Sequence, residues 1–491
     1  MATDMKPKQA FCLRPPRRSS SLSRFFLFSL VLLLTLLGTK LRHYDALTIF
    51  WPAEAVLLGL FIRRPDWASQ KLNWLIITLA YFCAELLAHN PLSIALLLTV
   101  ANVSGVSLAY WLITRNPLLD LSLRHPQAML TLAAYYGLAC VLSALLGGFA
   151  LYLHTSQDLP LAILSWVLTG LISYTAILPV ILTAPARPWR RFLEYWNEPH
   201  LMSLSQLAPA LSLFLTSLLS LLIDGPGSLA FPVLPLLWCA LSYSLFSTTL
   251  LTLFYVLWTL FALSQPMYFL PSQLHTSLDL LSLRIGIASI ALASITSASL
   301  MSARNLAVEK LQRLAHHDAL TGLLNKQAFY QQGQAILTQC RLKQVPVSVI
   351  VLDIDHFKPI NDTHGHHVGD LALSAITQRI SLALRDTDVC GRLGGEEFGI
   401  LLPDCSAQQA HAVAERVRKS ISLLPFSLDN EQQLTMTASL GVATLEPSTL
   451  EPSTLDLHAL LRQADTALYE AKRAGRDQSY SYHSPAPKTG T

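Results

Sequence analysis

Long apolar runs repeat through the first part of the chain, and they limit its fold more than any other feature. Between residues 201 and 301, the only charged side chains are Asp224, Asp279 and Arg284. Over the whole chain 13% of the residues are charged, whereas soluble domains average about 25%. Because a membrane-spanning helix needs about 20 mostly apolar residues, the sequence predicts a multi-span α-helical membrane domain at residues 24–302.

Ten apolar runs can be distinguished, near residues 25–38, 46–62, 73–89, 93–113, 127–153, 161–183, 206–223, 229–246, 248–264 and 281–302. No charged loop divides the pair within 229–264, so the expected number of spans is eight to ten. No small-residue cleavage site follows the first run, which favours an uncleaved span over a signal peptide. Basic residues gather in the 1–23 tail and in alternate loops, as in loops that face the cytoplasm. An even number of spans then places both termini in the cytoplasm.

Polar residues interrupt three of these runs: Glu54 in FWPAEAVLLGL, Glu85 in YFCAELLAHNP, and Asn102. Ionisable groups inside a membrane are costly and therefore mark candidate sites. The alternative is a hydrogen bond between helices without any ligand. The segment IFWPAEAVLLGLFIRR resembles the opening of MASE-type integral membrane sensor domains. That resemblance covers about residues 24–302, and it implies nothing about a ligand at Glu54.

The last third of the chain is charged throughout and alternates between helical and strand patterns. Residues 303–317 predict a coupling helix that continues the last span, with Leu306, Leu311 and Leu314 at near-heptad spacing. An α/β domain follows at 318–480, and a flexible tail at 481–491. Within the domain we expect helices at 318–341, 367–385, 406–424 and 456–474, and strands at 346–355 and 434–445.

The stretch RLGGEEFGILLP, residues 392–403, predicts a β-hairpin with Gly394 and Gly395 in the turn. Glycine reaches positive φ without steric cost, and a turn without side chains lets another molecule approach the backbone. Glu396 and Glu397 follow directly, and carboxylate oxygens suit a Mg²⁺–nucleotide. An ordinary hairpin with a solvated acidic tip is the alternative.

Five motifs stand in order through this domain: DALTGLLN, DIDHFKPINDTHGHHVGD, RDTD, GGEEF and YEAKRAGRD. Together they resemble the GGDEF family of diguanylate cyclases. The resemblance implies an α+β, nucleotide-cyclase-like fold with a central, mostly antiparallel sheet. It implies an enzyme that condenses two GTP to cyclic di-GMP and two pyrophosphates. It also implies a homodimer, because each half-site holds one GTP, in the cytoplasmic (inner) membrane of a bacterium.

The resemblance assigns roles residue by residue. Asp353, the main-chain carbonyl of Ile354 and Glu396 would bind two Mg²⁺ ions per active site, a role that Mn²⁺ can also fill. Glu396 is preferred over Glu397 for deprotonating the ribose 3′-hydroxyl. The other substrate-binding residues are Asn361, His366 and Asp370 for guanine, Lys358, Lys472 and Arg476 for phosphates, and Gly394 and Gly395 in the turn. Lys472 and Arg476 would share one helix face if the last helix reaches both.

RDTD lies shortly before the hairpin and matches the family's inhibitory product site. Arg385 and Asp388 would grip cyclic di-GMP, and Arg416 on the following helix would add a contact. The alternative is an exposed ion pair between residues three apart, worth roughly a few tenths of a kcal/mol.

Other functions fit parts of the sequence. A catalytically silent GGDEF module would act as a receptor for GTP or cyclic di-GMP, although Asp353, Glu396 and Lys472 are all present. A transporter would show flux that is independent of the hairpin. A metal phosphohydrolase could use His316, His317 and the histidines of THGHH, but no second His-Asp pair follows.

The expected partners are GTP, cyclic di-GMP, a second copy of the chain and the lipid bilayer. A net charge of +4 is too small to predict a nucleic-acid partner. The sequence departs from the family pattern at Lys326, Leu393 and Asp477, where Arg, an aromatic residue and Asn are usual. None of these departures removes a ligand, so we expect an active domain.

Overall fold

The computed structural model describes residues 21–40, 50–154, 158–185, 203–223, 228, 230–264, 277–423, 425–427, 433–446 and 456–483. The chain divides into two compact units, residues 1–306 and 307–491. Most of the tails expected at 1–23 and 481–491 lies outside the described residues.

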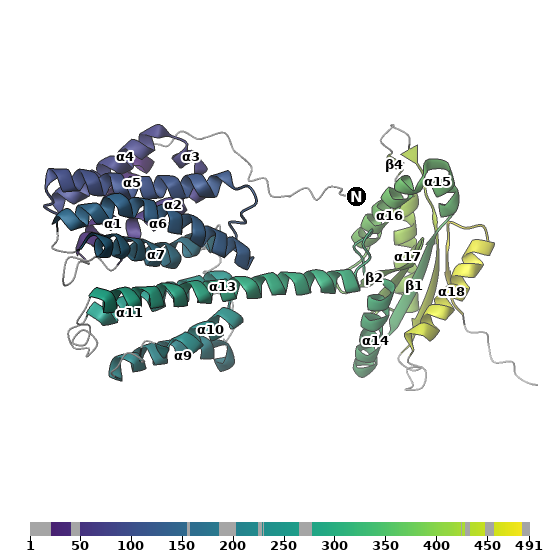
Figure 1. Ribbon diagram of the computed structural model, residues 1–491. Helices are drawn as coiled ribbons and strands as arrows, with labels where there is room; N and C mark the ends of the chain where they lie inside the picture. The colour runs from purple at the N-terminus through teal and green to yellow at the C-terminus, as the bar shows by residue number, and fades with distance from the viewer. Residues whose placement is uncertain are drawn as a thin grey trace, which may run out of the picture. The chain divides into compact units, whose positions relative to one another are not determined.

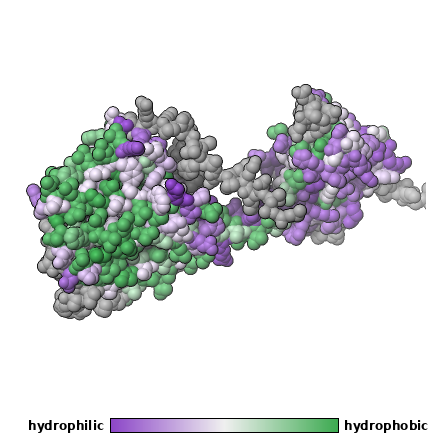
Figure 2. Space-filling model, turned by 45° about the horizontal axis from the view of Figure 1, so that its top comes forward, coloured by the Kyte–Doolittle hydropathy of each residue, from purple (hydrophilic) through white to green (hydrophobic). Residues whose placement is uncertain are grey.

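The first unit is built from helices. They are α1 (Ser21–Lys40), α2 (Pro52–Arg63), α3 (Pro65–Ala68), α4 (Lys71–Leu87), α5 (Leu92–Arg115), α6 (Pro126–His154), α7 (Leu159–Thr183), α9 (Leu204–Leu222), α10 (Val233–Ser242), α11 (Leu245–Ser264) and the first part of α13 (Ser277–His316). Among the described helices, seven are long and apolar enough to cross a membrane: α1, α5, α6, α7, α9, α11 and α13. Hydrophobic side chains cover most of the face of this unit that Figure 2 shows.

Three of the ten expected spans form shorter helices. The run near 46–62 becomes α2 with 12 residues, the run near 73–89 becomes α4 with 17, and the run near 229–246 contains α10 with 10. Pro65 explains where α2 ends, because a residue that precedes proline avoids the helical conformation. The pair within 229–264 does form two separate helices, α10 and α11.

Helix α13 runs without interruption for 40 residues and ends at His316. Its last part includes residues 303–316 of the predicted coupling segment. Leu306, Leu311 and Leu314 are 37%, 65% and 62% exposed. The end of this helix therefore presents apolar side chains at its surface.

The second unit is a five-stranded sheet with helices on both faces (Figure 1). The strands lie in the order β2 (Val389–Gly394), β3 (Glu397–Pro403), β1 (Val347–Ile354), β6 (Ala438–Leu445) and β7 (Ser479–Ser481). Neighbours are antiparallel except β6 and β7, which are parallel. Strands β4 (Phe426–Ser427) and β5 (Gln433–Leu434) form a separate pair. The mostly antiparallel sheet expected from the sequence is thus confirmed.

Strand β1 is buried on both faces of the sheet. Ile350, Leu352 and Ile354 join the core formed with α16 (His366–Leu382) and α17 (Ala407–Ser422). Val349 and Val351 join the core formed with α14 (Lys326–Lys343) and α18 (Leu457–Arg473). Because side chains alternate between the faces of a strand, burial on both sides requires the continuous apolar run seen at 346–355.

Residues 318–325 form a turn, so the prediction that a helix begins at 318 is wrong. The Asp318 carboxylate accepts hydrogen bonds from the backbone N–H and the hydroxyl of Thr321, both at 2.8 Å. Such local bonds compete with helix formation. Helix α14 begins at Lys326, and the side chain of Asn325 caps it by accepting from the Ala328 N–H.

A short helix that was not expected, α15 (Phe357–His364), lies between β1 and α16. Gly365, with a φ of +82°, separates the two helices. Helix α16 begins at His366, one residue before the predicted start at residue 367.

Candidate active site

The turn between β2 and β3 consists of Gly395 and Glu396, one residue later than the sequence suggested. Gly394 still belongs to β2 and pairs with Glu397. Gly395 has a φ of +36°, and a Cβ built there would meet no described atom within 4 Å. Glycine is therefore needed here for the backbone conformation rather than for packing, and the outer side of the turn is open.

Asp353 lies at the end of β1, beside this turn. Its partners across the sheet are Glu397 on β3 and Ser439 on β6. The following residue, Ile354, donates its backbone N–H to the Glu396 carbonyl over 3.4 Å. The structure therefore brings the three predicted metal-binding residues to one end of the sheet. It also places Glu397 directly opposite Asp353.

Lys472 reaches this acidic group from α18, with its Nζ 2.8 Å from Asp353 Oδ1. Burial raises the pKa of Asp353 even though Lys472 opposes the shift. Burial also raises the pKa of Glu397, and the carboxylates of Asp353 and Asp465 add to the effect. Carboxylates that disfavour one another's charge are stabilised by an additional cation. The carboxylates of Asp353 and Glu397 therefore suit the binding of a divalent cation.

In the described part of the chain, no group of three or more His, Cys, Asp or Glu side chains is arranged to hold a metal ion. An ion at Asp353 would therefore need main-chain, water or phosphate oxygens as further ligands, which is common for Mg²⁺ in nucleotide sites. The metal phosphohydrolase alternative gains no support from these residues. His317 instead makes a hydrogen bond through Nδ1 to the Gly322 carbonyl at 2.9 Å.

The residues expected to bind guanine lie on α15 and on the first turns of α16. A Cβ on Gly369 would lie 1.9 Å from Asn361 Oδ1, so only glycine lets this amide approach α16 so closely. His366 and Asp370 are exposed on α16, and Lys358 is exposed on α15. Because only two residues separate the end of β1 from the start of α15, these side chains belong to the same end of the sheet as Asp353.

Helix α18 does not reach Arg476, so the condition under which Lys472 and Arg476 would share one helix face is not met. Helix α18 ends at Arg473, and Arg476 lies beyond it with a φ of +61°. The raised pKa of Asp353 is caused mainly by burial, but the charges of Lys472 and Arg476 both oppose it. The Arg476 guanidinium therefore lies near the same carboxylate, although it is held by a loop and not by a helix.

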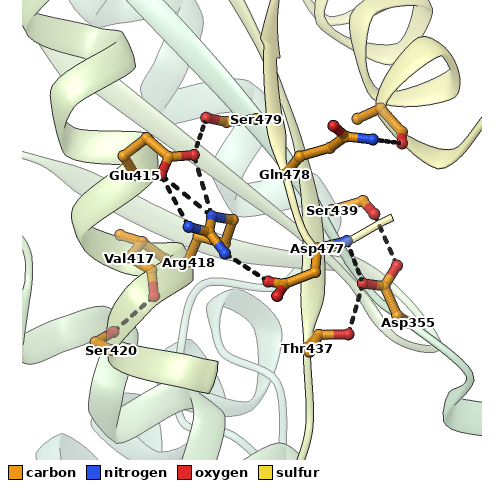
Figure 3. Close-up of polar contacts among 11 residues, drawn as sticks. Asp355, Glu415, Val417, Arg418, Ser420, Thr437, Ser439, Asp477, Gln478 and Ser479 are labelled. Atoms are coloured by element: carbon orange, nitrogen blue, oxygen red, sulfur yellow. Dashed lines mark hydrogen bonds and ion pairs between the residues drawn. The ribbon is translucent and has the colours of Figure 1, made fainter. Parts of the chain in front are cut away.

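A polar network holds that loop (Figure 3). The Asp355 carboxylate accepts from the hydroxyls of Ser439 and Thr437 at 2.7 and 2.8 Å, and from the backbone N–H of Asp477 at 3.1 Å. The Asp477 carboxylate in turn accepts from Arg418 Nη1 at 2.7 Å.

Asp465 is a residue of this region that the sequence did not single out. It lies seven residues before Lys472 on α18, and its charge adds to the effect of burial on the pKa of Glu397. Residues seven apart lie on the same face of a helix. That spacing from Lys472 is the signal that could have identified it.

Comparison with known proteins agrees with this geometry. The family described as "Diguanylate cyclase, GGDEF domain" matches residues 315–478. "Probable diguanylate cyclase DgcF" of Escherichia coli K12 is 33% identical over 276 residues, which cover 56% of this chain and 86% of that protein. This chain belongs to the GGDEF diguanylate cyclase family.

Two further matches cover different shares of this GGDEF protein. "Probable diguanylate cyclase DgcF" of Escherichia coli O157:H7 is 28% identical over 455 residues, which cover 92% of this chain and 93% of that protein. The crystal structure of the GGDEF domain of DgcB from Caulobacter crescentus in complex with c-di-GMP matches with 30% identity and a TM-score of 0.33. That match covers 35% of this chain and 94% of the DgcB chain.

In this GGDEF domain the RDTD motif forms a tight turn. The Asp388 carboxylate accepts from the backbone N–H of Arg385 at 2.8 Å, and the Asp388 N–H donates to the Arg385 carbonyl at 3.0 Å. Arg416 donates Nε and Nη2 to the Ala383 carbonyl, at 3.0 and 2.7 Å. Asp388 is thus bound to the backbone, while the Arg385 side chain is exposed. The three residues expected at the product site lie around one turn.

The glutamates inside the apolar helices are buried. Glu85 is 1% exposed and accepts a hydrogen bond from Asn90 Nδ2 at 2.6 Å. Glu54 is 5% exposed. Asn102 is fully buried, and its amide has no hydrogen-bond partner among the described residues. Glu85 therefore has an ordinary polar partner in Asn90, and the Tyr174 side chain lies within hydrogen-bonding reach of Glu54.

Proposed function

We propose that this chain is an active, membrane-bound diguanylate cyclase that condenses two GTP to cyclic di-GMP and two pyrophosphates. The observation that supports this most is the meeting of Asp353 with the Gly395–Glu396 turn, with Lys472 2.8 Å from the Asp353 carboxylate. Acidic oxygens for a metal ion and basic groups for phosphates are what phosphoryl transfer needs at one place.

Asp353, the Ile354 carbonyl and Glu396 hold two Mg²⁺ ions in this proposal, or Mn²⁺ in their place. Ions bound there would offset the negative charge of the phosphate groups. Lys472, Arg476 and Lys358 bind the phosphates of GTP. Lys472 lies beside Asp353, so its positive charge is next to the proposed metal site.

Glu396 helps to remove the proton from the ribose 3′-hydroxyl. It lies in the open turn, whereas Glu397 is fixed in β3 opposite Asp353. A general base must reach the proton it removes, and Glu396 lies in the turn rather than in the paired strand.

Asn361, His366 and Asp370 recognise guanine. A carboxylate can accept hydrogen bonds from the N1–H and the 2-amino group, and adenine has neither donor there. Acceptors that a bound base covers, and that are left without donors, are how a site rejects the wrong base. The position of Asn361 against α16 supports a shared surface for the base.

The protein works as a homodimer, because each GGDEF domain holds one GTP and the product needs two. The exposed leucines near the end of α13 supply an apolar stripe for pairing two copies. An even number of the apolar helices crosses the bacterial cytoplasmic membrane, so both termini are cytoplasmic. Cyclic di-GMP binds Arg385, Asp388 and Arg416 and inhibits its own synthesis.

The test uses the full chain in lipid nanodiscs with GTP and Mg²⁺. The parent forms cyclic di-GMP and pyrophosphate, and Glu396→Ala lowers turnover by about 100-fold or more. The control, Glu470→Gln, removes an exposed carboxylate on α18 and leaves turnover unchanged. A folded parent that binds GTP and forms no cyclic product contradicts the proposal and identifies a silent receptor instead.

A further inference from the structure

Three consecutive residues after α18 have positive φ angles: Gly475 at +121°, Arg476 at +61° and Asp477 at +46°. Only glycine adopts this region without steric cost, so the two side-chain-bearing residues need contacts elsewhere to hold them there. Arg476 is one of the phosphate-binding residues of the proposed function. The segment that carries it is therefore strained, and its conformation depends on what surrounds it.

Two groups hold this segment from different elements (Figure 3). Asp355 follows β1, is 5% exposed and accepts the backbone N–H of Asp477 at 3.1 Å. Its other hydrogen bonds, to Thr437 and Ser439, attach it to the start of β6. The same carboxylate thus fixes the loop to the end of the strand that carries Asp353.

Arg418 holds the side chain of Asp477 from α17. Its Nη1 lies 2.7 Å from Asp477 Oδ1, and its Nε and Nη2 donate to Glu415 at 3.0–3.2 Å. Glu415 also accepts from the Ser479 hydroxyl on β7. The guanidinium is thereby oriented by one carboxylate and binds the other, and its side chain is 17% exposed. Planar arginine is well suited to bridging two carboxylates in a fixed geometry.

We infer that Asp355 and Arg418 are positioning residues that hold the strained Gly475–Asp477 segment so that Arg476 reaches the phosphates of GTP. The inference rests on the proposed function. Neither residue touches substrate in this account: Asp355 acts on the backbone next to Arg476, and Arg418 acts through Asp477. The acid at 477, where the family usually has Asn, gives Arg418 a charged partner.

The test measures KM and kcat for GTP, and GTP affinity in parallel, with the full chain in nanodiscs. Arg476 binds phosphate in both the ground and transition states, so losing its position raises KM and leaves kcat nearly unchanged. We expect Arg418→Gln to raise KM and Kd by about tenfold with kcat within about twofold. Asp477→Asn keeps the shape and loses the charge, so it raises KM by a smaller factor, about threefold.

Double variants separate positioning from general destabilisation. In an Arg476→Ala background, Arg418→Gln changes KM and Kd by less than about twofold, because the residue it positions is gone. The control Arg473→Gln removes an exposed ion pair, 3.7 Å from Glu470, and changes neither constant. The inference is overturned if Arg418→Gln leaves Kd unchanged, or weakens binding by the same factor with and without Arg476.

The readouts keep this inference apart from the proposed function. A parent that binds GTP and forms no cyclic product contradicts the proposed function, yet the affinity cycle still tests the positioning role. If Arg418→Gln does not fold, Asp477→Asn in the two backgrounds gives the same comparison.

Discussion

The guanidinium of Arg392 lies 3.1 Å from the carboxylate of Asp318, which links strand β2 to the turn that follows α13. The same guanidinium donates Nε and Nη2 to the Gly395 carbonyl, at 2.9 and 2.6 Å. One side chain therefore connects the turn after the long helix to the turn that contains Glu396. The connection is local to the GGDEF domain.

Replacing Arg392 should affect chemistry more than substrate binding. Arg392→Gln frees the Gly395 carbonyl and loosens the turn, so Glu396 is placed less accurately in the transition state. We expect kcat to fall by about tenfold with KM changed by less than about threefold. Steady-state kinetics with GTP measure this. Arg462→Gln, at an exposed position on α18, is the matched control; a rise in KM with normal kcat contradicts the assignment.

Gly391 in β2 and Gly395 in the hairpin turn are needed for different reasons. At Gly395 an added Cβ would meet no neighbouring atom, but the backbone φ of +36° is unfavourable for a residue with a side chain. Gly395→Ala should therefore lower the free energy of unfolding by about 1 kcal/mol. At Gly391 a Cβ would lie 2.7 Å from Phe329 Cβ in the core, so Gly391→Ala should cost about 1–3 kcal/mol. Chemical denaturation of the two variants measures the difference. A larger loss of stability in Gly395→Ala than in Gly391→Ala would contradict this explanation.

The Glu415–Arg418 pair should give stability that disappears in acid. The hydrogen bond from Arg418 lowers the pKa of Glu415 in the folded protein, below the ordinary unfolded value of about 4.3. A lowered folded pKa adds stability that is complete above the unfolded pKa and is lost as the pH falls through the folded one. The gap in thermal midpoint between the parent and Glu415→Gln should therefore be present at pH 6 and narrow below about pH 4.3. Glu470→Gln, whose ion pair is exposed, should show no such gap.

Product inhibition should depend on Arg385. Its side chain is exposed at the RDTD turn, where it can pair with a phosphate of cyclic di-GMP. Arg385→Ala should raise the concentration of cyclic di-GMP that halves activity by about tenfold or more, with initial turnover unchanged. Asp386→Ala, an exposed neighbour, should behave like the parent. If product inhibits Arg385→Ala and the parent equally, these residues do not form an inhibitory site.

Much of the second unit could be predicted from the sequence because its signals are local. The β-branched run at 346–355 could only be a buried strand, and the amphipathic pattern at 456–474 gave α18 nearly to the residue. The residue at which α14 begins could not be predicted from the local sequence pattern. DALTGLLN has a helical pattern, but the Asp318 side chain binds Thr321 and holds a turn.

The arrangement of the site depended on pairing that the sequence does not state. Asp353 and Glu397 are 44 residues apart and face each other only because β1 pairs with β3 in one register. The loop position of Arg476 follows from contacts with Asp355 and Arg418, which come from two other elements. Motif resemblance identified these residues, but only the sheet register and the network explain how they meet.

The claim on which the account depends is that Asp353 and Glu396 hold the same metal ions. Binding of Mn²⁺ to the full chain with a non-hydrolysable GTP analogue, followed by electron paramagnetic resonance, tests it most directly. We expect Asp353→Asn and Glu396→Gln each to weaken Mn²⁺ binding by about tenfold or more, and the double variant to lose less than the two effects combined. Mn²⁺ affinity that is unchanged in Asp353→Asn, or losses that combine independently, would contradict a shared metal site.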